Sequence, residues 1–236
     1  MMRVGRIVRA GLLLSLLVTA ACGGGSTSAP DRRAPPLPAT VATESAPRAV
    51  ADSRPRIVCL GDSLTAGLGL PPDEAYPSLL QRKIDTEALG FEVVNAGVSG
   101  DTSAGGLSRL NWSLDGDVRV LVVALGGNDA LRGLPVAELR HNLSTIIETA
   151  QARGIRVILA GMEAPPNFGQ GYIVDFHQAY PELAKKYNVP LVPFLLEGVA
   201  GVEALNQRDG IHPTAEGARR VADNIWSVLR PTLKGS

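Results

Sequence analysis

Residues 57–64 read Ile57-Val58-Cys59-Leu60-Gly61-Asp62-Ser63-Leu64. The apolar first half predicts a buried strand, and the glycine after it indicates where the chain turns. This turn leaves the small hydroxyl of Ser63 at the carboxyl end of the strand, the edge where open α/β sheets place their reacting groups. A serine that only caps the following turn would have the same local sequence, so the residues elsewhere in the chain must decide whether Ser63 is a reacting group or a cap.

Apolar runs alternate with helical patterns along the chain, which predicts a parallel sheet with helices on both faces. The continuous run Val118–Leu125 is typical of a central strand that is covered on both sides. Pro190 and Pro193 place the last strand at an edge, because proline cannot donate to a sheet ladder. The predicted strands are Arg56–Leu60, Phe91–Asn95, Val118–Leu125, Ile155–Ala160 and Pro190–Phe194. The predicted helices lie near Ala75–Ala88, Ser103–Trp112, Pro135–Arg153, Tyr172–Tyr187 and Pro213–Leu229.

The segment Asp209-Gly210-Ile211-His212-Pro213 closes the domain and carries a candidate base. The chain has three histidines, and the other two, His141 and His177, lie within helical patterns. Only His212 combines a carboxylate three residues before it, a spacing that can bring both groups to one face, with a neighbouring proline that fixes the backbone. If Pro213 is the first helical residue, His212 lies at a helix N-terminus.

Together, Ser63, His212 and Asp209 supply a nucleophile, a base and a group that orients the base. This is the minimum set for acyl transfer through a covalent intermediate. Such chemistry also needs donors aimed at the developing oxyanion, and the candidates are the backbone N–H groups of Ser63 and Gly100 and the side-chain amide of Asn128. Taken singly, Gly100 and Asn128 are explained by ordinary turn chemistry.

Asp62 and Asp129 are two further carboxylates close to these loops in the sequence. Either could orient His212, but spacing favours Asp209. We therefore expect Asp62 and Asp129 to brace the site loops.

In this order and context, Ser63, Gly100, Asn128 and His212 resemble the SGNH (GDSL) hydrolase family, and within it the bacterial thioesterase I, lysophospholipase and arylesterase branch. The stretches that carry the resemblance are 61–67, 95–103, 125–133, 180–184, 189–194 and 209–213. The resemblance implies a flavodoxin-like three-layer α/β/α fold with a five-stranded parallel sheet. It also implies a metal-independent serine esterase without a cofactor. Ser63, Asp209 and His212 would then form the catalytic triad, and Ser63, Gly100 and Asn128 the oxyanion hole. The chain departs from the family pattern at Ala164. Members of the family often carry a bulky aliphatic residue at this position, in a loop that borders their acyl site.

The N-terminus has the features of an export signal: Arg3, Arg6 and Arg9, a short apolar stretch, and small residues just before Cys22. We interpret residues 1–21 as a lipoprotein-type signal peptide with Cys22 as the lipidated residue, although Thr19 stands where such signals usually have an aliphatic residue. Residues 22–54 are rich in Pro, Ser and Ala and predict a disordered tether, and residues 55–233 form the hydrolase domain. The expected location is the cell envelope, with the protein held at a membrane by the lipid anchor or, after ordinary cleavage, secreted.

Composition excludes some classes of function. Removal of residues 1–21 takes away three arginines and no acidic residue, which leaves 20 of the 23 basic side chains against all 23 acidic ones. A mildly acidic chain without a basic cluster has no electrostatic footprint for nucleic acid. The dispersed histidines and the two cysteines give no metal-binding spacing, and Cys59 is best explained as a small core hydrophobe.

The leading functional hypothesis is a serine esterase that acts on small-molecule acyl esters or thioesters, in the manner of an arylesterase, acyl thioesterase or lysophospholipase. Two alternatives remain, a carbohydrate O-acetylesterase and a catalytically silent surface lipoprotein that only binds a ligand. The sequence makes no prediction about the oligomeric state.

Overall fold

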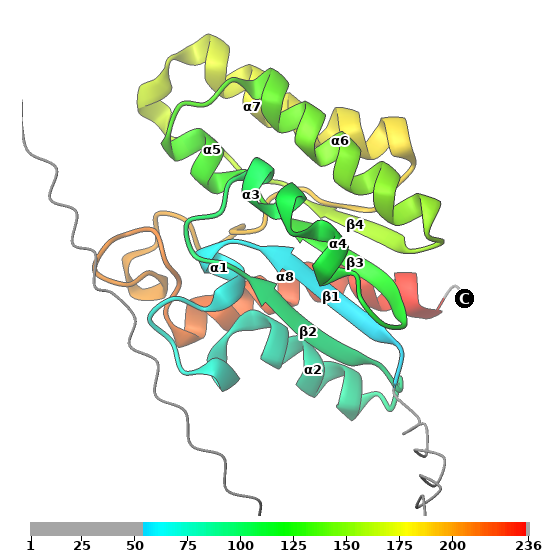
Figure 1. The fold of residues 1–236 in the computed structure, drawn as a ribbon. Coiled ribbons are helices and arrows are strands. Elements are labelled where there is room, and N and C mark those ends of the chain that lie inside the picture. The colour runs from blue at the N-terminus through cyan, green and yellow to red at the C-terminus, as the bar shows by residue number, and fades with distance from the viewer. Residues whose placement is uncertain (1–53, 235–236) are drawn as a thin grey trace, which may run out of the picture. The chain divides into compact units, whose positions relative to one another are not determined.

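The computed structural model describes residues 54–234 of the chain, and the expected signal peptide, Cys22 and almost all of the expected tether lie outside these residues. The described part contains five parallel strands in the order β2-β1-β3-β4-β5 (Figure 1). Their bounds are β1 Arg56–Gly61, β2 Glu92–Gly97, β3 Val118–Ala124, β4 Arg156–Ala160 and β5 Leu191–Val192. All five predicted strands are present, and the predicted parallel sheet is confirmed.

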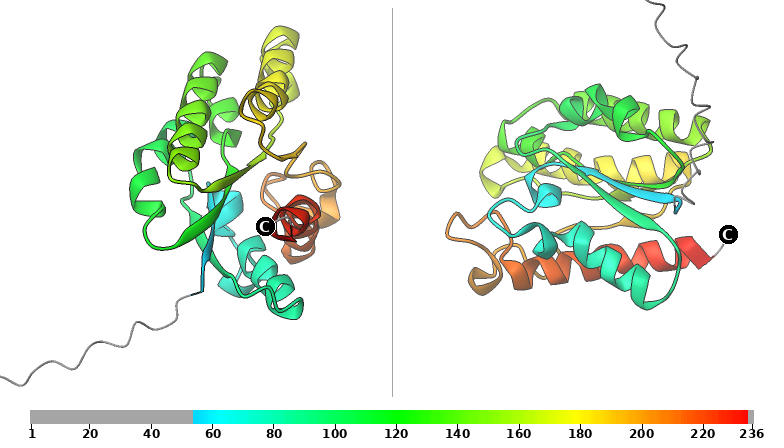
Figure 2. Two further views of the ribbon diagram at one scale, coloured as in Figure 1. Left: turned by 90° about the vertical axis from the view of Figure 1, so that its right-hand side faces the viewer. Right: turned by 60° about the horizontal axis from the view of Figure 1, so that its bottom comes forward.

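Helices cover both faces of the sheet, which gives the predicted three-layer α/β/α architecture (Figures 1 and 2). The helices α2 and α8 pack together on one face, and α3, α6 and α7 lie on the other. The helices are α1 Ser63–Ala66, α2 Tyr76–Thr86, α3 Ser103–Ser108, α4 Leu110–Ser113, α5 Gly127–Leu131, α6 Val136–Ala152, α7 Gln170–Tyr187 and α8 Ala215–Lys234. Short 3₁₀ turns span Pro72–Glu74, Pro166–Phe168 and Glu203–Leu205.

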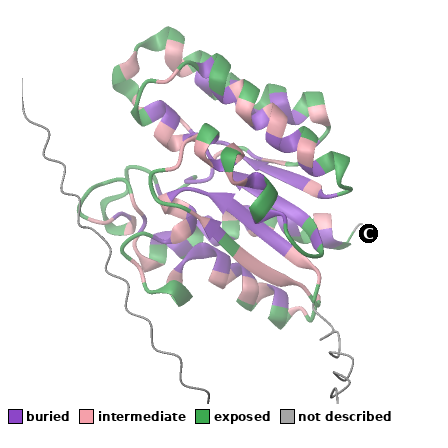
Figure 3. Ribbon diagram, in the orientation of Figure 1, coloured by how far each residue is buried: buried purple, intermediate pink, exposed green. Residues whose placement is uncertain are grey.

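The central and edge positions in the sheet agree with the composition of the strands. The strand β3 lies in the middle of the sheet, and every residue of it except Arg119 is buried (Figure 3). The strand β5 is at the edge, as its prolines predict, and it is only two residues long because Pro190 and Pro193 flank it. Cys59 lies in β1 and is fully buried, which confirms it as a core residue.

One predicted helix is in fact two. The helical pattern of Ser103–Trp112 divides into α3 and α4 at Arg109, whose backbone angles (φ −106°, ψ 6°) leave the helical range. The break coincides with the point where the Arg109 side chain turns inward to donate hydrogen bonds to the ends of two strands. Among the described residues, no helix combines the length and the apolar character that crossing a bilayer requires.

The register of the central strands brings three loops together. Gly61, at the end of β1, is paired with Gly97 at the end of β2 and with Ala124 at the end of β3. The three strands therefore end level with one another, and the loops that follow them share one edge of the sheet.

Candidate active site

Ser63 lies where β1 turns directly into α1, of which it is the first residue. Asp62 caps this helix, and its Oδ1 accepts a hydrogen bond from the Leu64 N–H at 3.0 Å. A Cβ atom at position 61 would lie 2.8 Å from the backbone oxygen of Ala124, so only glycine fits where the strand ends. This sharp turn presents the Ser63 hydroxyl at the carboxyl edge of the sheet.

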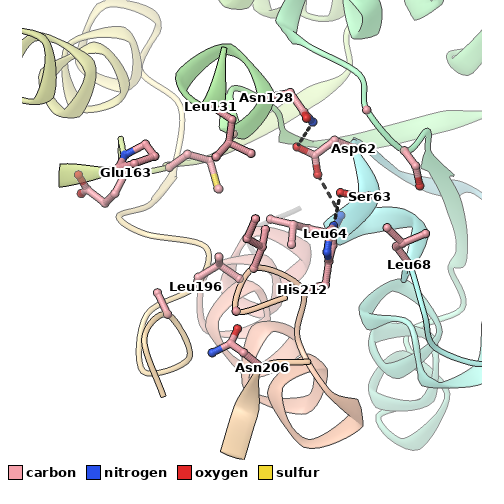
Figure 4. Close-up of a pocket in the computed structure, with 18 residues that line it drawn as sticks. Asp62, Ser63, Leu64, Leu68, Asn128, Leu131, Glu163, Leu196, Asn206 and His212 are labelled. Carbon is pink, nitrogen blue, oxygen red and sulfur yellow. Dashed lines mark hydrogen bonds between the residues drawn. The ribbon is translucent and has the colours of Figure 1, made fainter. Parts of the chain in front are cut away.

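His212 joins the hydroxyl of Ser63 to the carboxylate of Asp209. Its Nε2 lies 2.9 Å from Ser63 Oγ (Figure 4). Its Nδ1 lies 2.7 Å from Asp209 Oδ2. The other carboxylate oxygen of Asp209 accepts the backbone N–H groups of His212 at 3.0 Å and Ile211 at 2.9 Å.

These hydrogen bonds, first of all that from the His212 backbone N–H, hold the pKa of Asp209 well below its usual range. The ionised carboxylate accepts the Nδ1–H of His212, and this tautomer leaves the Nε2 lone pair to accept the hydroxyl proton of Ser63.

The expectation that Pro213 begins the last helix is wrong. The helix α8 begins at Ala215, and Thr214 occupies the capping position, where its Oγ1 accepts the N–H of Gly217 at 3.3 Å. Pro213 instead pairs with Asn206 in an isolated antiparallel bridge. This bridge and the backbone hydrogen bonds to the Asp209 carboxylate, rather than a helix terminus, fix the backbone around His212.

The three predicted oxyanion donors border one cavity beside the hydroxyl of Ser63. Among residues 54–234, the backbone N–H groups of Ser63 and Gly100 have no hydrogen-bond partner. Gly100 has φ +86°, a conformation that glycine adopts without strain. The side-chain amide of Asn128 donates to the backbone oxygen of Asp101 at 2.9 Å and to Asp62 Oδ2 at 3.3 Å.

The two additional carboxylates hold the site loops, as the sequence predicts. Asp129 accepts hydrogen bonds from the N–H and the hydroxyl of Ser103 at 2.8 and 2.5 Å, which ties α5 to α3. Asp62 is 3% exposed, and burial raises its pKa to about 6, although the N–H of Leu64 partly offsets this. The contact of Asp62 with Asn128 was not predicted.

A cavity of about 340 Å³ opens beside Ser63 and His212 (Figure 4). Its wall is mainly apolar, with the side chains of Leu64, Leu68, Leu131, Met162, Pro165, Leu196, Ala200 and Ile211. Ala164, which was expected near an acyl site, is buried and does not line the cavity, whereas its neighbour Glu163 does. The cavity has the size and character of a site for an apolar small-molecule group.

The two other histidines lie outside this cavity. The ring of His177 is 60% exposed, and its Nδ1 lies 2.6 Å from Glu163 Oε1. His141 lies in α6 and is exposed. Within the described range, no group of three or more His, Cys, Asp or Glu side chains is arranged to hold a metal ion.

Sequence reasoning missed Arg109, which donates to the backbone oxygens of Gly61 and Ala96 and pairs with Asp101. The sequence does carry a signal for it. An arginine between Leu107 and Leu110 interrupts an apolar helical pattern, which indicates a charge that faces inward and therefore needs partners.

Comparisons with known proteins agree with this geometry. Residues 59–220 match the model of the GDSL-like Lipase/Acylhydrolase family. Esterase TesA of Pseudomonas aeruginosa is 44% identical over 178 residues, which cover 75% of this chain and 89% of that protein. Thioesterase 1/protease 1/lysophospholipase L1 of Escherichia coli K12 is 38% identical over 178 residues, which cover 75% of this chain and 84% of that protein. The psychrotrophic esterase EstA from Pseudoalteromonas sp., in a structure inhibited by monoethylphosphonate, superposes with a TM-score of 0.72 at 32% identity, covering 76% of this chain and 98% of that one.

Proposed function

This chain belongs to the GDSL-like lipase/acylhydrolase family and is a serine carboxylic ester hydrolase, and on that premise we propose that Ser63 is its nucleophile, His212 its general base and Asp209 the group that orients His212. The observation that carries this proposal is the continuous set of contacts from Asp209 Oδ2 through the imidazole to Ser63 Oγ, with distances of 2.7 and 2.9 Å. These contacts lie at the wall of an apolar cavity.

The proposed reaction begins when Ser63 Oγ attacks the carbonyl carbon of the ester and its proton passes to His212 Nε2. Negative charge develops on the carbonyl oxygen, where the N–H groups of Ser63 and Gly100 and the amide of Asn128 stabilise it. The tetrahedral intermediate then expels the alcohol or thiol, which takes the proton from His212 and leaves an acyl group on Ser63. Water, deprotonated by the same imidazole, attacks this acyl group and releases the acid.

The proposed substrates are small acyl esters and thioesters with an apolar acyl chain. The apolar cavity beside Ser63 supports this choice, because a hydrocarbon chain gains free energy when it leaves water for such a wall. The names of the relatives, an esterase and a thioesterase/lysophospholipase, support the same range of substrates. Aryl esters belong to the proposed range, since an apolar wall is also suited to an aromatic group.

The test uses initial rates of the full chain on p-nitrophenyl esters from acetyl to palmitoyl. We expect Ser63→Ala to lose about 10³-fold or more in kcat. Ser99→Ala is the matched control, because Ser99 borders the same cavity without contacting His212, and it should retain the activity. Equal rates for the wild type and Ser63→Ala would refute the proposal. Faster turnover of acetylated glycans than of any acyl ester would indicate the O-acetylesterase alternative.

We also propose that the chain is exported and that Cys22 carries a lipid that holds it at a membrane of the cell envelope. The basic start, the short apolar stretch and the small residues before Cys22 support this proposal. Fractionation of the native host tests it. The wild type should sediment with membranes and Cys22→Ser should be released, whereas equal distribution of the two proteins would contradict lipidation.

A further inference from the structure

A charged side chain lies behind the proposed oxyanion hole without bordering the cavity. Arg109 stands at the junction of α3 and α4, and its side chain is only 16% exposed. Its Nε lies 2.6 Å from Asp101 Oδ2, one terminal nitrogen donates to the backbone oxygen of Ala96 at 2.8 Å, and the other donates to that of Gly61 at 2.8 Å. One guanidinium therefore joins the end of β1, the end of β2 and the loop that follows β2.

Two of these segments lead into proposed oxyanion donors. Gly61 is the last residue of β1, and the Ser63 N–H follows it by two residues. Ala96 lies near the end of β2, on the strand that leads to Gly100. Arg109 thus fixes the position of the end of β1 relative to the end of β2, and the backbone N–H groups of Ser63 and Gly100 follow these two ends.

The third segment leads to the remaining donor. The Asp101 carboxylate is held by Arg109, and the backbone oxygen of the same residue accepts the Asn128 side-chain amide at 2.9 Å. Asp101 also directly follows Gly100 in the chain. Each of the three proposed donors is therefore connected to Arg109 through a single residue or a short run of backbone.

We propose that Arg109 is a positioning residue that holds the three oxyanion donors in register for the reaction at Ser63. The inference rests on the proposed function, because it concerns how the geometry of that same site is maintained. A guanidinium suits this role: it is planar, always charged, and donates in several fixed directions at once, which an ammonium group cannot do. A displacement of about 1 Å at a catalytic donor can cost about 10²-fold in rate, so small changes in register matter.

The same two strands offer a matched control at their other ends. Arg56 begins β1, and its Nε pairs with Glu92 Oε2 of β2 at 2.9 Å. This ion pair also joins β1 to β2 and is far along the strands from Ser63. A variant at Arg56 therefore reports what the loss of a strand-joining arginine does to stability alone.

The experiment compares Arg109→Lys with Arg56→Lys in the full chain on one p-nitrophenyl ester, with the folded fraction measured by circular dichroism. We expect Arg109→Lys to lower kcat by about 10- to 100-fold with KM within about twofold of the wild type. Arg56→Lys should keep both constants, with a small loss of thermal stability because its ion pair is partly exposed. A kcat for folded Arg109→Lys within about twofold of the wild type would overturn the proposal, and so would an equal loss of kcat in Arg56→Lys.

A second pair of variants tests the same proposal by chemical rescue. Arg109→Ala should lose about 10²- to 10³-fold in kcat, and millimolar guanidinium should restore part of it because the ion can occupy the vacated place. Guanidinium should not raise the activity of Arg56→Ala, and an equal response of the two alanine variants would overturn the proposal. Full activity of Ser63→Ala in the same assay would instead overturn the proposed function, so the two failures are distinguishable.

Discussion

Asp62 caps α1 and Asn128 lies in α5, and the carboxylate Oδ2 of the first is 3.3 Å from the side-chain Nδ2 of the second. The amide nitrogen carries two hydrogens, and the other one goes to the backbone oxygen of Asp101 at 2.9 Å. The longer contact is the weaker one. We infer that a substrate oxyanion replaces Asp62 as the acceptor of this hydrogen, while Asp101 keeps the amide in place.

The first prediction concerns Asn128. Asn128→Ala should lower kcat by about 10²- to 10³-fold and change KM little, because the lost donor acts mainly in the transition state. Asn142→Ala is the control: Asn142 also donates through its amide, to Ser103 Oγ at 3.0 Å, but does not border the cavity. A higher KM at unchanged kcat would show that Asn128 binds the ground-state substrate instead.

The second prediction concerns the pH dependence of stability, and it follows from the burial of Asp62. Burial raises the pKa of Asp62 to about 6, from 3.8 for an exposed aspartate. Between pH 4 and pH 6 the folded chain therefore keeps a proton that the unfolded chain has lost. The contribution of Asp62 to the free energy of unfolding is fully present below about pH 4 and is lost as the pH rises through about 6.

Asp62→Asn removes this titration. The free energy of unfolding of the wild type minus that of Asp62→Asn should fall by about 3 kcal/mol between pH 4 and pH 7, as measured by urea unfolding. Asp117→Asn, which changes an exposed carboxylate, controls for the loss of one acidic group. A difference between wild type and Asp62→Asn that stays constant or grows with pH would contradict the burial of an ionisable group at this position.

The third prediction concerns Cys59, whose thiol is fully buried in β1. Burial raises its pKa to about 12, so the reactive thiolate is scarce at neutral pH and reagents have no access to it. In a Cys22→Ser variant, Cys59 is the sole thiol. This variant should not react with Ellman's reagent when folded, should release about one equivalent in guanidinium chloride, and should keep its esterase activity. Rapid labelling of the native protein would show that β1 opens readily.

The parallel pairing of the strands, the central place of β3 and the edge position of β5 could all be predicted, because apolar runs and prolines are local signals. The alignment of Ser63 with His212 could also be expected, since both belong to short motifs at the ends of the domain. The division of one helix into α3 and α4 could not. The break lies at Arg109, whose side chain donates hydrogen bonds to the backbone oxygens of Gly61 and Ala96, and those partners are distant in sequence.

The details of the site departed from expectation for the same reason. Pro213 was expected to start α8, but Thr214 provides a side-chain cap and moves the start of the helix beyond it. The hydrogen bond between Asp62 and Asn128 depends on how β1 and β3 align, and no local pattern encodes that distance. Contacts between loops are thus the part of this site that only the structure provides.

The last prediction distinguishes the two carboxylates closest to the proposed machinery. Asp209 Oδ2 faces the Nδ1 of His212 at 2.7 Å, whereas Asp62 faces Asn128 and the N–H of Leu64. Asp209→Asn should lower kcat by about 10³-fold or more, because an amide can donate to Nδ1 and so favour the tautomer that cannot accept the Ser63 proton. The change in KM should be small, since Asp209 does not line the cavity.

Asp62→Asn should lose less activity than Asp209→Asn, because its carboxylate has no role in proton transfer. Both variants need to be compared at equal folded fraction, and the pH should be well above 6, where Asp62 is ionised in the wild type. The opposite ranking would mean that Asp62 orients His212 in the working enzyme. The Asp209 carboxylate, which is half exposed to solvent, would then serve only to shape the turn through the backbone N–H groups of Ile211 and His212.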